Sequence, residues 1–199
     1  MKKYIPIVVI LLLTSCSIKS YEYVLEMKKP NFSKELEFSD DKIKIVFDIG
    51  KSDISFALRN KTSSGIKILW DEASFVKKGE AQKIIHKNVK LIDKEKSQIA
   101  TVIPPSSYIK DRIQPIDDIV YNTVYYGNKN QSFWSTKPFY PLVYRKNIDK
   151  IKPLKGTKLN IYLPIQSEGK LLEYYFEFEV VDILLRSSKI NVLSLFKEE

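Results

Sequence analysis

The sequence has very little of the residues from which many enzyme sites are built: one cysteine, Cys16, and one histidine, His86, among 199 residues. A single cysteine excludes an intrachain disulfide, and a single histidine excludes a metal site made of several imidazoles. The Gly-x-Ser-x-Gly elbow of serine hydrolases is missing as well. Gly50-Lys51-Ser52 matches the end of a phosphate-binding loop, but Ile45 stands where the first glycine belongs. The sequence therefore argues against several large classes of enzyme.

Long apolar runs are also missing, and the one marked run lies at the N-terminus. It extends from Ile5 to Leu13, is interrupted only by Pro6, and is far short of the roughly 20 residues that a membrane-spanning helix needs. Lys2 and Lys3 precede the run, and small residues follow it. A charged start, a short apolar stretch and small residues at the cut are typical of a secretory signal peptide.

Residues Leu13-Thr14-Ser15-Cys16 resemble the lipobox of bacterial lipoproteins, a branched aliphatic residue followed by two small residues and a cysteine. The resemblance implies that residues 1–15 are removed and that the Cys16 thiol receives a diacylglycerol. Residues 16–20 would then form a short tether, and residues 21–199 a single domain. In Gram-negative lipoproteins an aspartate after the cysteine usually signals inner-membrane retention, so Ser17 implies the outer membrane in such an organism. The alternative is an ordinary secretory signal with an incidental cysteine.

Removal of the signal leaves 184 residues, enough for one sizeable core, with 31 basic and 24 acidic side chains. Export makes nucleic acid an unsuitable partner for this positive charge. Anionic lipid head groups or acidic envelope polymers suit this charge better than nucleic acid. The simpler interpretation, which the absence of a basic block favours, is a solvated, lysine-rich surface.

Alternation of apolar and polar residues dominates the chain after the anchor. It marks Ile43–Ile49 and Ile54–Leu58 as neighbouring half-buried strands, and Lys158–Leu163 and Leu172–Val180 as a hairpin. Short strands separated by turn signals predict an all-β fold, an antiparallel immunoglobulin-like β-sandwich. Trp70 is a candidate for its core aromatic residue.

Residues 104–155 break this rhythm and predict a long insertion. Six of the nine prolines lie in this segment, and proline is excluded from central strands. Eight aromatic residues lie within 121–144, and Tyr and Trp offer large, rigid contacts for sugars, peptides or proteins. The candidate binding surface consists of Tyr125, Tyr126, Phe133, Trp134, Phe139 and Tyr140. The alternative is that these side chains pack the insertion onto the sandwich.

Two further hypotheses concern catalysis and cation binding. An envelope hydrolase could use His86 with an aspartate from the Asp111–Asp118 region, although a structural role for His86 is the simpler hypothesis. Asp111, Asp117 and Asp118 offer oxygen ligands for a hard cation, but their spacing is not that of an EF-hand and suits turns equally well. We therefore expect no catalytic residue, no metal and no cofactor.

Parts of the mature chain resemble bacterial envelope lipoproteins with an immunoglobulin-like domain. The residues that carry this resemblance are Asn60-Lys61-Thr62, the segment from Ile68 to Val76, His86, and Ile103-Pro104-Pro105. The resemblance supports the fold and implies no activity. The sequence thus predicts a lipid-anchored, non-catalytic binding or scaffold module of the cell envelope, with another envelope protein or a polysaccharide as its partner.

Overall fold

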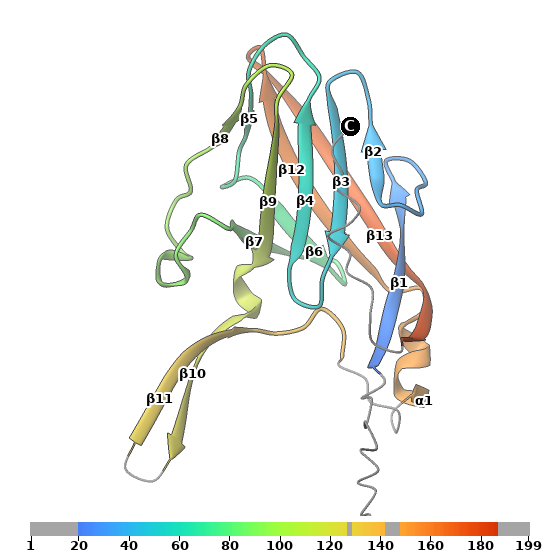
Figure 1. Ribbon diagram of the computed structural model, residues 1–199, viewed down its shortest axis with the longest axis vertical. Coiled ribbons are helices and arrows are strands. Elements are labelled where there is room, and N and C mark those ends of the chain that lie inside the picture. The colour runs from blue at the N-terminus through green and yellow to red at the C-terminus, as the bar shows by residue number, and fades with distance from the viewer. Residues whose placement is uncertain (1–19, 127–128, 142–147, 187–199) are drawn as a thin grey trace, which may run out of the picture.

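The computed structural model describes residues 20–126, 129–141 and 148–186, and they form an all-β, antiparallel structure (Figure 1). Within these ranges, no helix has both the length and the apolar character to cross a membrane. The strands are β1 (Ser20–Lys29), β2 (Glu37–Ser39), β3 (Ile43–Ile49), β4 (Ile54–Asn60), β5 (Ile66–Ile68), β6 (Ser74–Lys77), β7 (Glu80–His86), β8 (Thr101–Ile103), β9 (Tyr108–Pro115), β10 (Ile119–Tyr126), β11 (Lys129–Thr136), β12 (Lys158–Ser167) and β13 (Lys170–Arg186). Short helical turns are η1 (Leu91–Asp93), η2 (Ile116–Asp118), α1 (Ile148–Ile151) and η4 (Lys152–Leu154).

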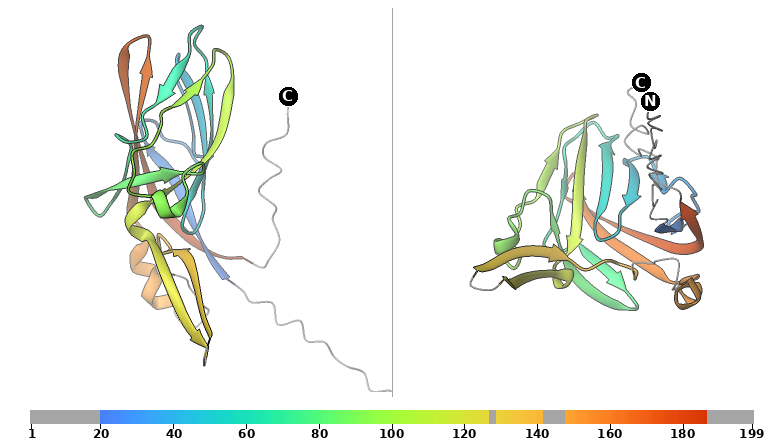
Figure 2. Two further views of the ribbon diagram at one scale, coloured as in Figure 1. Left: turned by 90° about the vertical axis from the view of Figure 1, so that its left-hand side faces the viewer. Right: turned by 60° about the horizontal axis from the view of Figure 1, so that its bottom comes forward.

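Eleven strands form one nearly closed, barrel-like sheet in the order β1-β13-β12-β6-β7-β9-β4-β3-β2, with β5 joined to β12 and β8. The sheet folds back on itself, so that β3, β4 and β9 face β12 and β13 (Figures 1 and 2). β7 makes the corner between these layers. Residues 80–83 of β7 pair with β6, whereas residues 84–86 pair with β9.

The core lies between the two layers and follows the predicted alternation. Ile43, Ile45 and Phe47 of β3 point inward, while their polar neighbours face solvent. The Phe47 ring meets Phe176 and Phe178 of β13 in edge-to-face contacts, with centroids 4.8 and 5.1 Å apart. Such pairs add to the hydrophobic stabilisation that burial of the rings provides. The all-β prediction is therefore confirmed.

The predicted insertion at 104–155 is wrong at its N-terminal boundary. β9 lies within this range, and it is a member of the main sheet that pairs with β4 along residues 108–113. Its interior is free of proline, because Pro104 and Pro105 precede the strand and Pro115 is its last residue. The segment that leaves the main sheet begins at Ile116 with η2 and continues into a separate two-stranded sheet, the β10–β11 hairpin.

The two ends of the molecule differ in character (Figure 1). The connections β2–β3, β4–β5, β8–β9 and β12–β13 lie together at one end, which we call the loop end. At the opposite end, which we call the terminal end, β1 begins, β13 finishes, and α1 and the β10–β11 hairpin are found. The hairpin projects away from the main sheet in both orientations of Figure 2.

Candidate functional site

The predicted lipidation site, Cys16, and the signal peptide lie outside the described residues. The structure begins at Ser20, the first residue of β1. Only Ser17, Ile18 and Lys19 therefore separate β1 from the predicted anchor. At about 3.5 Å per residue, this link reaches at most about 14 Å.

The structure divides the six candidate binding residues, and two of them belong to the core. Phe139 is only 2% exposed and stacks on Phe75 with centroids 5.1 Å apart, and its backbone N–H donates to the Lys51 carbonyl over 2.8 Å. Tyr140 is also buried and contacts the Tyr23 ring at 4.7 Å. Burial raises the pKa of Tyr140 to about 12. Phe139 and Tyr140 thus pack against the main sheet at its terminal end and do not form a surface.

The remaining candidates lie on the β10–β11 hairpin. Tyr125 is 72% exposed and Phe133 is 46% exposed, and Tyr121, at 60%, joins them. Trp134 is half-buried, where it contacts the Tyr121 ring and packs on a small apolar cluster beside the main core. Tyr126 belongs to β10, but its side chain lies outside the described set. The accessible part of the predicted surface is therefore confined to this hairpin.

The hairpin is fastened to the rest of the domain at its base. The Lys94 ammonium donates to the carbonyls of Ile116 and Ile119 over 2.8 and 3.1 Å, and the Lys137 N–H donates to the Asp118 carbonyl over 2.8 Å. A hollow of about 390 Å³ separates the base from β7 and β9 and is lined by residues that include His86, Arg112, Gln114, Trp134 and Thr136. Isolated two-stranded sheets are only marginally stable in water, so these base contacts hold the hairpin in place.

His86 and Asp111 are brought together, as the hydrolase hypothesis requires. Both side chains are buried, and His86 Nδ1 lies 3.1 Å from Asp111 Oδ2. The imidazole stacks on Trp70 with centroids 4.6 Å apart and planes within 4°. Burial raises the pKa of the Asp111 carboxyl, but hydrogen bonds from His86 and from the N–H groups of Arg112 and Lys87 outweigh this effect, and the net pKa is lowered.

Within the described ranges, the hydrogen bonds of His86 do not include one to a nucleophile. Among the residues that the structure describes, no hydrogen bond joins His86 to a serine or threonine hydroxyl, the contact on which a Ser-His-Asp set depends. Gln98 completes the group instead: its Oε1 accepts from the backbone N–H of His86 over 3.3 Å, and its Nε2 donates to the Ile84 carbonyl over 2.6 Å. His86, Asp111 and Gln98 therefore form a buried polar network that fixes the corner in β7, and Trp70 stacks on its imidazole.

The proposed cation ligands do not converge. Asp111 points into the His86 network, whereas Asp117 and Asp118 lie in η2 at the base of the hairpin. Over the described ranges, no group of three or more His, Cys, Asp or Glu side chains is placed to hold a metal ion. These aspartates therefore serve the buried network and a turn.

A polar cluster at the loop end was not foreseen as a unit. Asn60, which is fully buried, donates through Nδ2 to the carbonyls of Ser64 and Pro104 over 2.7 and 3.0 Å, and its Oδ1 accepts from the Thr62 N–H over 2.9 Å. A further Nδ2 contact reaches the Ile103 carbonyl at 3.1 Å. Asn60 therefore joins the β4–β5 and β8–β9 connections, the two places where Asn60-Lys61-Thr62 and Ile103-Pro104-Pro105 stand in the sequence.

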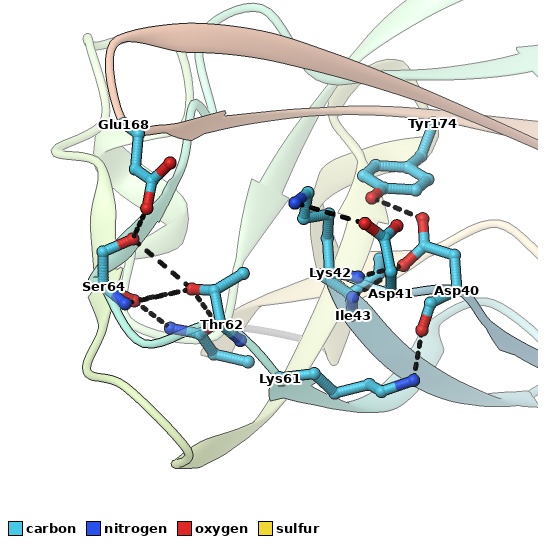
Figure 3. Close-up of polar contacts among 10 residues, drawn as sticks. Asp40, Asp41, Lys42, Ile43, Lys61, Thr62, Ser64, Glu168 and Tyr174 are labelled. Atoms are coloured by element: carbon cyan, nitrogen blue, oxygen red, sulfur yellow. Dashed lines mark hydrogen bonds and ion pairs between the residues drawn. The ribbon is translucent and has the colours of Figure 1, made fainter.

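Neighbouring loops extend this cluster (Figure 3). Asp40 Oδ1 accepts from the N–H groups of Lys42 and Ile43 over 2.8 and 2.7 Å, and its Oδ2 accepts from the Tyr174 hydroxyl over 2.9 Å. The Lys61 ammonium donates to the Asp40 carbonyl. These bonds fix the turn before β3 against β13, so the cluster gives the loop end a defined shape.

Beside the cluster lies an open hollow of about 430 Å³ with a basic lining. Lys44, Arg59 and Lys61 contribute the charge, and Ser39, Asn60 and Ser106 complete the wall. Lys44 is also paired with Glu37 at 2.9 Å.

Comparison of the chain with family models, curated proteins and solved structures finds no match.

Proposed function

We propose that the protein is a lipid-anchored lipoprotein of the cell envelope that acts as a non-catalytic binding or scaffold module. The observation that carries the proposal is the lipobox-like sequence Leu13-Thr14-Ser15-Cys16 after a short apolar run. Two or three acyl chains at ~0.8 kcal/mol per buried CH₂ anchor a protein stably, whereas one chain does not. The short link from Cys16 to β1 is compatible with a domain held close to the bilayer.

Anchoring at Cys16 would orient the domain. The terminal end would face the bilayer, and the loop end would face away from it into the envelope (Figure 1). Ser17 favours the outer membrane if the organism is Gram-negative. The basic hollow at Lys44, Arg59 and Lys61 suits an acidic partner, either another envelope protein or a polysaccharide.

The finer fold assignment is also a proposal. We propose that the barrel-like sheet is a variant of the immunoglobulin-like sandwich. Two facing antiparallel layers and the fully buried Trp70 support it. The continuous connection of the layers through β7 departs from the two separate sheets of that fold.

Metabolic labelling with radioactive palmitate tests the proposed anchor. The wild-type chain should incorporate label and sediment with membranes, whereas Cys16→Ser should lose both the label and stable attachment. Ser17→Asp is the matched control, because it should keep the label and move to the inner membrane of a Gram-negative host. Equal labelling of wild type and Cys16→Ser would refute the proposal.

The second candidate, an envelope hydrolase, is favoured only by the 3.1 Å contact between His86 and Asp111. A fluorophosphonate probe distinguishes the two candidates, because it reacts with activated serine nucleophiles. The hydrolase hypothesis requires labelling of the wild type and loss of labelling in His86→Gln. We expect no labelling of either chain, since no hydroxyl is bonded to His86 within the described residues.

A further inference from the structure

We propose that the β10–β11 hairpin is a second membrane contact that lies in the lipid headgroup layer beside the anchor. The inference rests on the proposed lipidation of Cys16, because the anchor places the terminal end at the bilayer. The partner of the exposed hairpin is then a lipid surface rather than a protein.

Position is the first argument. β1 begins at the terminal end, and its first residue lies within about 14 Å of the Cys16 backbone, the greatest span of the intervening chain. The hairpin projects from the same end and extends beyond the start of β1 (Figure 1). A bilayer close enough to hold the acyl chains on Cys16 is therefore within reach of the far ends of β10 and β11.

Side-chain character is the second argument. The strand register places Tyr121 and Tyr125 on one face of the hairpin and Phe133, opposite Asn122, on the other. All three rings are substantially exposed. Aromatic side chains with a polar group favour the membrane–water interface, where the ring lies in the apolar region and the hydroxyl stays hydrated.

Charge is the third argument. Residues 119–141 contain two lysines, Lys129 near the tip and Lys137 after β11, and no acidic side chain. Both lysines are exposed. Basic residues at a membrane surface attract anionic lipid head groups. The acidic pair at this site, Asp117 and Asp118, precedes the hairpin in η2, on the side of the main sheet.

The backbone limits how deeply the hairpin enters. A two-stranded sheet leaves both outer edges unpaired, and unpaired backbone groups are not tolerated in the hydrocarbon region. Exposed polar residues such as Thr123, Ser132 and Gln131 impose the same limit. The hairpin therefore lies among the head groups, with the ring of Tyr125, which pairs with Asn130 near the far end of the hairpin, at the boundary of the acyl chains. A protein partner at this place would have to fit between the domain and the bilayer.

Depth-dependent fluorescence quenching tests the inference. The full lipidated chain carrying Tyr125→Trp is reconstituted into vesicles of phosphatidylethanolamine and phosphatidylglycerol with brominated acyl chains. Tyr108→Trp is the matched control, since Tyr108 is also an exposed strand tyrosine, 59% against 72%, and begins β9 at the loop end. Wild-type emission from Trp70 and Trp134 is subtracted from both.

The emission added by Tyr125→Trp should be quenched, and more strongly by bromine near the head groups than by bromine near the chain ends. The emission added by Tyr108→Trp should remain unquenched. Equal quenching of the two variants, or no quenching of Tyr125→Trp, would overturn the inference. A hairpin that binds another protein would give the second result in vesicles of lipid alone.

Vesicle flotation and the mass of the N-terminal peptide separate this inference from the proposed function. A lipidated protein that floats without quenching of Tyr125→Trp refutes only the hairpin contact. A protein without lipid on Cys16 refutes the anchor and, with it, the orientation on which the hairpin contact depends. Circular dichroism and urea unfolding of both variants establish that each retains the fold. The absence of quenching then reports that the introduced tryptophan lies away from the bilayer.

Discussion

The His86–Asp111 pair gives the most quantitative prediction, because three hydrogen-bond partners of the Asp111 carboxylate are defined. Replacement Asp111→Ala removes the acceptor of the His86 Nδ1 contact at 3.1 Å and of the Lys87 and Arg112 N–H groups at 3.2 and 2.7 Å. A buried donor without a partner costs about 1–3 kcal/mol. The cost at His86 should lie at the upper end of this range because His86 is buried. The cost at Lys87 and Arg112 should be smaller, because water can reach the backbone groups of these exposed residues. We therefore expect a loss of about 3 kcal/mol in the free energy of unfolding.

Urea denaturation of the purified chain, followed by tryptophan fluorescence, measures this loss. Asp117→Ala is the matched control, because Asp117 is exposed and should change stability by no more than about 0.5 kcal/mol. A loss below about 1 kcal/mol for Asp111→Ala would contradict the view that this carboxylate organises the corner of β7.

The same pair predicts a dependence on pH. The pKa of Asp111 in the folded chain lies below its ordinary value of 3.8, so the carboxylate contributes stability above about pH 4. This contribution should be lost as the pH falls through the lowered folded-state pKa. Asp111→Asn should lack it, so the stability difference between wild type and variant should shrink in acid. A difference that stays constant from neutral pH to pH 2 would be inconsistent with an ionised Asp111.

Three further predictions follow from burial. Phe139→Ala should destabilise the protein by about 3–5 kcal/mol in urea unfolding because Phe139 is core, whereas Phe133→Ala on the exposed hairpin should change stability by less than about 1 kcal/mol; similar losses would be inconsistent with this division. Asn60→Asp should lower the melting temperature strongly, since it turns the Nδ2 contacts with three carbonyl oxygens into contacts between a carboxylate and carbonyl oxygens. An unchanged melting temperature would contradict the observed bonding. The raised pKa of Tyr140, about 12, predicts stability that is full below pH 10 and lost as the pH rises toward 12; alkaline unfolding in which Tyr140→Phe matches the wild type would be contrary evidence.

Much of the fold could be predicted from local patterns. Alternation placed the inward residues of β3 and β4 correctly, because a strand with one buried face must repeat every two residues. Trp70 is buried as expected. The β12–β13 hairpin near the C-terminus was predicted too, although β12 continues through Pro164 to Ser167.

Features that depend on distant contacts could not be predicted in this way. The change of partners within β7 requires β6 and β9 to lie on either side of it, and no local pattern encodes that arrangement. Composition treated Phe139 and Tyr125 alike, yet Phe75 and Lys51 bury the first and nothing in the main sheet covers the second. Proline content misplaced the start of the insertion, because prolines at the ends of β9 do not interrupt its ladder.

The residues of the polar clusters lie far apart in the sequence, so no local pattern predicted that they would meet. Asn60 and Pro104 lie 44 positions apart, and His86 and Asp111 lie 25 apart. The first pair became a contact because antiparallel strands bring the β4–β5 and β8–β9 connections together at the loop end, and the second because β7 pairs with β9. The residues that suggested a resemblance to envelope lipoproteins thus include those that fasten the loop end and the corner of β7.

The mass of the N-terminal peptide of the protein isolated from membranes tests the central claim most directly. Digestion with trypsin should release a peptide that begins at Cys16 and ends at Lys19, with residues 1–15 absent and the mass of a diacylglycerol added to the cysteine. A peptide with an unmodified Cys16, or one that begins at another residue, would contradict the lipid anchor and the orientation derived from it.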